Sequence, residues 1–187
     1  TAPKGAAAEY VPKAALPPAD KEGFIPLFNG KDLTGWTGAV NGYGVENGIL
    51  YCDPKVGGNL YTEHQFSDFV LKFEFKLPPG ANNGLGIRAP MQGDAAYVAM
   101  ELQILDDTAE QYAKLKAHQY HGSIYGVVAA KRGHQKPVNE WNEQEVRAIG
   151  GKITVILNGT TIVDADISKI TETPDGKGLA GHPGLAR

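Results

Sequence analysis

The sequence predicts an all-β protein, a sandwich or a barrel of antiparallel strands, and three observations point to this class. Short segments in which apolar and polar residues alternate recur along the chain, separated by turn residues. The 24 glycines and 12 prolines are spread over all 187 residues, as in proteins with many tight turns. Helical periodicity is found only at residues 108–115, for about two turns. Many strands with almost no helix are typical of sandwiches and barrels.

The clearest strand is predicted over residues 69–77. Successive side chains of a strand point to opposite faces, so its aromatic residues and leucines share one face and its charged residues lie on the other. Such a strand covers a core on one side and meets water on the other. Further strands are expected at 24–28, 43–51 (with a turn inside), 85–88, 97–105, 122–128, 142–149, 152–157 and 160–163.

Three Asn-Gly pairs are expected to reverse the chain: Asn29-Gly30, Asn47-Gly48 and Asn158-Gly159. Both residues of such a pair tolerate the left-handed backbone conformation that two-residue hairpins require. We therefore expect the third pair to join the strands that flank it into a hairpin.

A chain of this length can form a single domain with a sizeable core, and it needs no disulfide to do so. Residues 1–22 are rich in Ala, Pro, Lys and Glu without apolar periodicity, so we expect a flexible N-terminal linker or tail there. Residues 23–187 are expected to form one β-sandwich domain. The chain begins without Met and without an apolar signal segment, which is expected of a mature form whose export signal has been removed.

The composition excludes several classes of function. The 18 basic and 21 acidic residues give a net charge of −3, and no segment concentrates Lys and Arg, so no nucleic-acid partner is expected. No apolar run approaches the ~20 residues that span a bilayer. The sequence also lacks a serine nucleophile elbow, a phosphate loop, a dinucleotide fingerprint and paired His or Cys metal motifs. The single cysteine, Cys52, cannot form an intrachain disulfide and leaves the compartment open.

Residues 100–107, Met-Glu-Leu-Gln-Ile-Leu-Asp-Asp, form the most informative segment. In a strand, Leu102 and Ile104 would point to the core while Glu101 and Gln103 line the opposite, accessible face. A carboxylate within an apolar strand needs a partner or a cleft, so Glu101 is a candidate functional residue. Asp106, at the end of the strand, either caps the following turn or holds a divalent cation, for which Glu101 is the other candidate ligand.

Two glycines and an arginine alternate in the segment 84–88, Gly-Leu-Gly-Ile-Arg. Glycines on one face of a sheet leave space for a ligand or another backbone. Arg88 would lie on the same face, where its planar guanidinium suits either sugar hydroxyls or a carboxylate such as Glu101. A purely structural Arg–Glu pair is the alternative.

Two further segments carry residues suited to binding sugars. Tyr120, His121 and Tyr125 combine aromatic rings and hydroxyls with a side chain that titrates near neutral pH, although a single histidine is often structural. Asn59, Tyr61 and Glu63 would share one face of a strand that follows a Gly-Gly turn; their alternative role is turn chemistry and a solvated strand face.

The chain resembles the 3-keto-disaccharide hydrolase domain family, long described as a domain of unknown function. The resemblance extends over most of residues 23–166, and its most specific parts are the opening segment that ends in Gly35-Trp36 and the Tyr-His-Gly-Ser segment at 120–123. The matching segments are 23–36, 58–63, 84–88, 100–107, 120–126 and 140–142.

The resemblance implies a two-sheet antiparallel jelly-roll sandwich of the concanavalin A-like lectin/glucanase type, with the ligand on its concave face. It also implies export to the periplasm or cell surface of Bacteroidetes-type bacteria. Family members usually continue past residues 181–184 into a last strand, so we expect this chain to lack that strand. The activity implied is cleavage of glycosides already oxidised to a ketone at C3.

The residues favour one mechanism for such a cleavage. Laminarinase-type relatives of this fold place three acids at alternate positions of one strand, whereas here those positions read Glu101, Gln103 and Leu105. A ketone at C3 acidifies the proton on C2, so a single base can start an elimination of the C1 substituent, and water then adds. We assign Glu101 or His121 as the base and Arg88 or a divalent cation as the oxyanion partner. The residues expected to bind the sugar are Asn59, Tyr61, Glu63, Gln103, Tyr120 and Tyr125. The alternative is a non-catalytic carbohydrate-binding module.

Overall fold

The computed structural model describes residues 10–91 and 98–186, which divide between two compact units, residues 1–65 and 66–187. Each unit is described by itself. The prediction of an all-β protein is confirmed, because the strands pair antiparallel throughout and the 3-10 helices of the described part have only three or four residues. None of the helices in these two ranges is long and apolar enough to cross a membrane.

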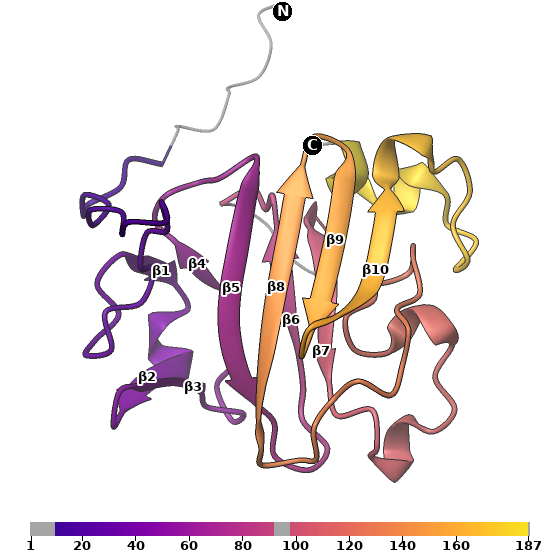
Figure 1. Cartoon of the computed structure of the whole chain (residues 1–187), viewed down its shortest axis with the longest axis horizontal. Coiled ribbons are helices and arrows are strands. Elements are labelled where there is room, and N and C mark those ends of the chain that lie inside the picture. The colour runs from indigo at the N-terminus through magenta and orange to yellow at the C-terminus, as the bar shows by residue number, and fades with distance from the viewer. Residues whose placement is uncertain (1–9, 92–97, 187) are drawn as a thin grey trace, which may run out of the picture. The chain divides into compact units, whose positions relative to one another are not determined.

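The first unit contains two small antiparallel pairs of strands (Figure 1). Strand β1 (Trp36–Gly38) pairs with β4 (Leu60–Thr62), and β2 (Tyr43–Glu46) pairs with β3 (Ile49–Cys52). The β2–β3 turn is the predicted Asn-Gly hairpin: Asn47 and Gly48 have φ angles of 51° and 78°, both in the left-handed region. Trp36 fixes the preceding loop because its indole Nε1 donates to the Leu27 carbonyl at 2.8 Å.

The part of the predicted tail that the structure describes, residues 10–22, contains no strand or helix but is partly anchored. The Glu63 carboxylate accepts hydrogen bonds from the Tyr10 hydroxyl (3.1 Å) and from the backbone N–H groups of Lys13 and Ala14 (3.0 Å each). The ring of His64 is 2.7 Å from the Ala14 carbonyl. Residues 10–14 are therefore held to the end of β4, whereas residues 1–9 lie outside the described part.

The second unit is a sandwich of two antiparallel sheets (Figure 1). The larger sheet has the strand order β10-β9-β8-β5. The smaller sheet pairs β6 with β7, and Ile124 extends it through an isolated bridge to Leu102. Their bounds are β5 (Phe69–Lys76), β6 (Asn82–Ile87), β7 (Met100–Leu105), β8 (Trp141–Ile149), β9 (Lys152–Leu157) and β10 (Thr160–Asp166).

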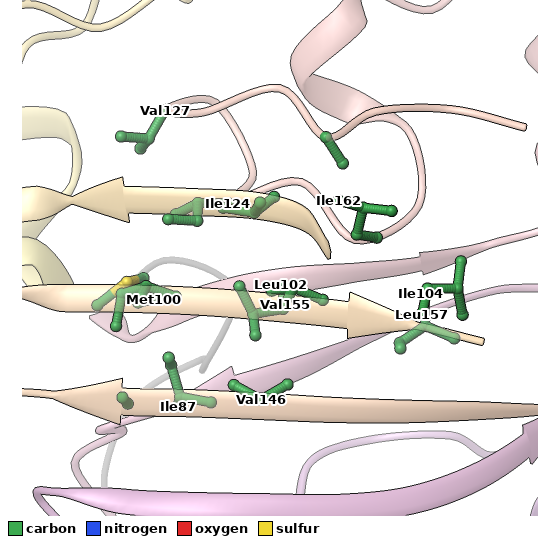
Figure 2. Close-up of a cluster of buried hydrophobic side chains, with 14 of the residues drawn as sticks. Ile87, Met100, Leu102, Ile104, Ile124, Val127, Val146, Val155, Leu157 and Ile162 are labelled. Carbon is green, nitrogen blue, oxygen red and sulfur yellow. The ribbon is translucent and has the colours of Figure 1, made fainter. Parts of the chain in front are cut away.

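The core of this unit is built from the inner faces of both sheets (Figure 2). The alternation predicted for the strand at 69–77 is confirmed: every second residue of β5 packs on the core and the residues between are exposed. Leu102 of the smaller sheet and Val146 and Val155 of the larger one are fully buried. Burial of each such side chain favours folding by about 1.5–3 kcal/mol. The two-sheet antiparallel sandwich is thus confirmed, whereas the jelly-roll connectivity and the single domain over 23–187 stay predictions.

Four predicted elements differ from the structure. The helix expected at 108–115 is wrong, since only Glu110–Tyr112 form a 3-10 turn; two helical turns are too short to be stable without packing. In the segment 122–128 only positions 124 and 128 form bridges, because Gly122 and Gly126 have left-handed φ angles of 76° and 77° that interrupt a strand. No strand forms at 24–28, which contains Pro26. The strand expected from residue 97 begins at Met100, and residue 97 itself lies outside the described residues.

Candidate active site

Strand β7 places its polar and apolar residues on opposite faces, as the sequence predicted. Met100, Leu102 and Ile104 pack in the core, whereas Glu101 and Gln103 point to the other side of the sheet. Glu101 is paired with Gly86 across the β6–β7 ladder. On the other side of β7, the Tyr125 N–H donates to the Glu101 carbonyl at 2.9 Å. The half-buried Glu101 is therefore flanked by a residue without a side chain and by an aromatic residue.

A cavity of about 250 Å³ opens over this face of β7. Its walls come from β6 and β7, from the segment around residue 125 and from the C-terminal segment 175–185. Its polar lining residues are Asn82, Glu101, Gln103, Tyr125, Asp175, Lys177 and His182. The cavity thus combines carboxylates, an amine, an imidazole and a phenol, which can bind hydroxyl groups and transfer protons.

Gly84 determines where the carboxyl group of Glu101 lies. A Cβ atom at residue 84 would be 2.0 Å from Glu101 Oε1 and 2.7 Å from Cδ. Any residue other than glycine at this position would therefore displace the carboxylate. The space that the sequence predicted for a ligand at this glycine is filled by the side chain of Glu101.

Gln103 and Tyr125 both line the cavity, as expected for residues that bind a substrate. Gln103 is 5% exposed, and its Nε2 donates to the Gln119 carbonyl at 3.3 Å. Tyr125 is 37% exposed, and its hydroxyl accepts a hydrogen bond of 2.7 Å from Gln119 Nε2. Gln119 thus fixes both side chains, and a fixed hydroxyl loses less entropy when it binds a sugar.

Arg88 points toward Ser67 and Asp68, whereas the sequence suggested that it lies on the same face as Glu101. It follows the end of β6 with a φ angle of 51°, so it leaves the strand alternation. Its guanidinium Nε donates to the Ser67 carbonyl at 2.7 Å, and an Nη atom is 3.1 Å from the Asp68 carboxylate. Arg88 is not among the residues that line the cavity, and its carboxylate partner is Asp68 instead of Glu101.

His121 lies in the interior, with 2% of its surface exposed. Its Nδ1 accepts from the Leu105 N–H (3.3 Å) and its Nε2 is 2.9 Å from Gln144 Oε1, so both ring nitrogens are engaged. Its ring also stacks on Phe75 at 5.0 Å between centroids. Burial lowers the pKa of His121 to about 4, although the bond to Gln144 opposes the shift. This ring is held neutral and is not among the residues that line the cavity, so its environment does not suit the role of base that the sequence suggested.

Tyr120 is also buried, with 4% of its surface exposed. Its hydroxyl donates to the Tyr112 carbonyl at 2.9 Å, and the Arg132 guanidinium lies over its ring at 3.4 Å from the centroid. This arrangement gives Tyr120 a structural environment instead of the substrate contact that we expected.

Asp106 caps the turn after β7, the first of its two expected roles. It accepts hydrogen bonds from the Gly80 N–H (2.8 Å) and from the N–H and hydroxyl of Thr108 (2.9 and 2.6 Å). Burial raises its pKa, but these bonds outweigh burial and hold the pKa below its usual range. Within residues 10–91 and 98–186, no three His, Cys, Asp or Glu side chains gather as a metal site would require.

Asn59, Tyr61 and Glu63 belong to the first unit, and the cavity to the second. Tyr61 and Glu63 do not lie on a solvated face: both are at least partly buried, and Glu63 binds the segment 10–14 as described above. The bonds from the Ala14 N–H and Tyr10 lower the pKa of Glu63 against the opposing effect of its burial. Their expected role in substrate binding stays a prediction.

The residues missed by sequence reasoning are those of the C-terminal segment. His182 Nε2 is 2.9 Å from Asp175 Oδ2, and the two side chains are 15% and 14% exposed, respectively. Burial raises the pKa of Asp175, but hydrogen bonds from Thr173, Lys177 and His182 outweigh burial and hold the pKa well below its usual range. The residues lie seven positions apart in a segment with 3-10 turns and no strand, so no periodicity could have paired them.

Comparison with known proteins agrees with this architecture. Residues 23–185 match the sequence family described as the 3-keto-alpha-glucoside-1,2-lyase-like domain. The chain is 26% identical over 173 residues to a 3-keto-disaccharide hydrolase of Bacteroides thetaiotaomicron, an alignment that takes in 79% of this chain. The chain spans 60% of the length of that relative.

Two crystal structures from Parabacteroides distasonis, each titled "putative glycosyl hydrolase", share the fold. The first is 30% identical with a TM-score of 0.72, and the alignment covers 82% of this chain and 78% of the other. The second is 24% identical with a TM-score of 0.69, covering 86% and 82%, and shows likeness of fold alone. The resemblance read from the sequence is confirmed, and the chain belongs to the 3-keto-alpha-glucoside-1,2-lyase-like domain family.

Proposed function

We propose that this protein cleaves the glycosidic bond of glycosides and disaccharides that carry a ketone at C3 of the sugar, with Glu101 as the base. The carboxylate takes the proton from C2, which the neighbouring ketone acidifies. The C1–O bond then breaks, the departing oxygen takes up a proton, and a C1–C2 double bond remains. Water adds to this bond, its hydroxyl group to C1, while C2 regains a proton that has exchanged with solvent and Glu101 is again ionised, so that the sum of the steps is hydrolysis.

The observation that carries the proposal is that Glu101 lines a polar cavity of about 250 Å³. A retaining glycosidase that acts directly needs two carboxyl groups about 5–5.5 Å apart across the bond. In β7 the alternate positions after Glu101 are Gln103 and Leu105, and the other carboxylate of the cavity, Asp175, is bound to His182. A reaction that starts with one carboxylate as base suits this set of residues better.

Substrate binding is assigned to the cavity residues that are already held in place. Gln103 and Tyr125 present an amide and a hydroxyl that Gln119 orients, and Asn82 adds a further amide. Such groups bind the several hydroxyls of a sugar with directional hydrogen bonds. Arg88 and His121 are not part of the proposal, because Arg88 pairs with Asp68 and His121 is enclosed in the core.

The test combines turnover with isotope uptake. The wild-type protein is incubated in D2O with a 3-keto-glucoside, and the released sugar is analysed by mass spectrometry for deuterium at C2. We expect cleavage with uptake of one deuterium, and a loss of turnover by a factor of roughly 10²–10⁴ in the Glu101→Gln variant. Free 3-keto-glucose in the same buffer without protein measures the spontaneous exchange.

Three outcomes would count against the proposal. Cleavage without deuterium at C2 would exclude proton abstraction, and a fully active Glu101→Gln variant would exclude this residue as the base. Binding of 3-keto and ordinary disaccharides in calorimetry without any turnover would instead identify a carbohydrate-binding module.

Export to the periplasm or the cell surface is part of the proposal, and family resemblance is what supports it. Fractionation of the producing bacterium followed by immunoblotting tests it. Detection of the protein in the cytoplasmic fraction alone would contradict it.

A further inference from the structure

The His182–Asp175 pair has the geometry of an imidazole that a carboxylate orients for proton transfer. The hydrogen bond between His182 Nε2 and Asp175 Oδ2 is 2.9 Å long. Asp175 is itself fixed by the Thr173 hydroxyl (2.7 Å) and the Lys177 N–H (3.1 Å). A carboxylate that accepts from one ring nitrogen leaves the other to take and give a proton.

The second ring nitrogen of His182 is available to a ligand. Within the described part of the chain, Nδ1 has no hydrogen-bond partner, and it is not among the enclosed polar atoms. The side chain lines the same cavity as Glu101. His121 differs in this respect, because both of its nitrogens are bonded within the core.

Gly126 connects the pair to the part of the cavity that holds Glu101. A Cβ atom at residue 126 would be 2.6 Å from His182 Cε1 and 3.0 Å from Asp175 Oδ2. The pair therefore packs directly on the backbone of Gly126. The preceding residue, Tyr125, is the one whose N–H donates to the Glu101 carbonyl at 2.9 Å. Glu101 and the His182–Asp175 pair thus lie on adjoining walls of one cavity.

We infer that His182 is a second catalytic residue, which protonates the oxygen that leaves C1, and that Asp175 is its positioning residue. This inference rests on the proposed function. When Glu101 takes the C2 proton, the electron pair of the C–H bond forms the C1–C2 double bond and the C1–O bond breaks. The departing oxygen takes the proton from His182 Nδ1 and leaves as an alcohol. The neutral imidazole then takes a proton from the water molecule that adds to C1, and the Glu101 carboxyl group, whose proton exchanges with solvent, returns a proton to C2. Both residues thereby regain their starting states.

The inference also names the substrates that need this residue. An alcohol or a sugar is a poor leaving group and departs readily only when its oxygen receives a proton. A nitrophenolate is stable as an anion and departs without one. His182 should therefore be required for 3-keto-disaccharides and alkyl 3-keto-glycosides, and dispensable for 3-keto-glycosides with an activated aryl group.

The test compares two substrates of the same anomeric configuration, methyl and 4-nitrophenyl 3-keto-glucoside. In the His182→Gln variant, the amide can still donate to Asp175 but cannot transfer a proton. We expect turnover of the methyl glycoside to fall by a factor of about 100 or more, the usual effect of a lost general acid. Turnover of the 4-nitrophenyl glycoside should stay within a few-fold of wild type.

The outcomes separate this inference from the proposed function. Glu101→Gln should lose turnover of both substrates, because the C2 proton must be removed from each. Equal losses on the two substrates in His182→Gln, or full activity on both, would overturn the role of His182 while leaving that of Glu101. A wild-type protein that cleaves neither substrate would overturn the proposed function and this inference with it. Circular dichroism and the thermal midpoint of His182→Gln show whether the variant is folded.

Discussion

Two histidines of the second unit occupy opposite kinds of environment. His121 is enclosed between the sheets, with both ring nitrogens bonded and its pKa lowered to about 4 by burial. His182 lies at the wall of the cavity with one nitrogen bound to Asp175. The first ring serves as a neutral polar connection within the core, while the second has the orientation and access that proton transfer requires.

The difference between the two histidines shows that a sequence motif does not predict whether a histidine side chain is accessible. His121 stands among tyrosines and glycines in a segment specific to the family, which favoured it as the base. Its neighbours in space, however, are Phe75, Leu105 and Gln144, and these belong to three other strands. The accessibility of a side chain depends on such long-range packing, and the residues next to it in sequence do not reveal it.

The contrast between the enclosed His121 and the accessible His182 can be tested most directly through the pH dependence of stability. The unfolded chain binds a proton at His121 with the ordinary pKa of about 6.5, whereas the folded state resists protonation down to about pH 4. The unfolded state therefore binds more protons between these values, and stability falls as the pH falls through this window. We expect a loss of roughly 2–3 kcal/mol in the free energy of unfolding from pH 7.5 to 4.5, measured by urea titration.

The His121→Gln variant isolates this contribution. Asp107 acts in the opposite direction, since burial raises its pKa, but it is present in both proteins and cancels in the difference. Between pH 7.5 and 4.5 the variant should lose less free energy of unfolding than the wild type. Its turnover of a 3-keto-glucoside, expressed per amount of folded protein, should equal that of the wild type. A native-state NMR titration in which the resonance assigned to His121 shows a pKa near 6.5 would contradict the enclosed environment, whether or not the variant folds.

The strands could be predicted where local pattern and burial agree. The alternation of β5, the Asn-Gly hairpins at 47–48 and 158–159 and the strands β8 and β9 follow from residues close in sequence. The predicted helix at 108–115 failed because two helical turns are too short to be stable without packing, and only Glu110–Tyr112 form a 3-10 turn. Local signals were therefore sufficient for long strands and insufficient for short connections.

The site could be predicted only in part, and for a similar reason. Glu101 and Gln103 follow from the alternation of one strand, and both line the cavity. Arg88 was expected two positions beyond Gly86 on the same face, but its left-handed φ of 51° turns it toward Asp68. Nothing local indicated that a residue 81 positions after Glu101, His182, would lie at the same cavity.

Two glycine variants test whether the position of the His182–Asp175 pair at the cavity matters for turnover. Gly126→Ala introduces a Cβ atom 2.6 Å from His182 Cε1 at a φ of 77°. Gly133→Ala imposes the same backbone strain at a φ of 87° but meets no atom within 4 Å. Each should lose about 1 kcal/mol of stability from the left-handed conformation.

Only Gly126→Ala should also lose turnover of the methyl 3-keto-glucoside, by about tenfold, because misplacing a catalytic group by a fraction of an ångström slows proton transfer. Steady-state kinetics and urea unfolding of both variants provide the measurement. Equal activity of the two variants would show that contact with Gly126 does not position the imidazole.

The smallest effects should come from the two tyrosines of the segment 120–126, which repeat the contrast between core and cavity. Tyr120→Phe removes a buried hydrogen bond to the Tyr112 carbonyl, so we expect a loss of about 1 kcal/mol in unfolding free energy and an unchanged KM.

Tyr125→Phe removes a partly exposed hydroxyl from the cavity wall. Its stability should change little, while KM for a 3-keto-disaccharide rises about threefold, the effect of one lost neutral hydrogen bond. If KM responds to Tyr120→Phe instead, the sugar must bind on a different face of this segment from the one that lines the cavity.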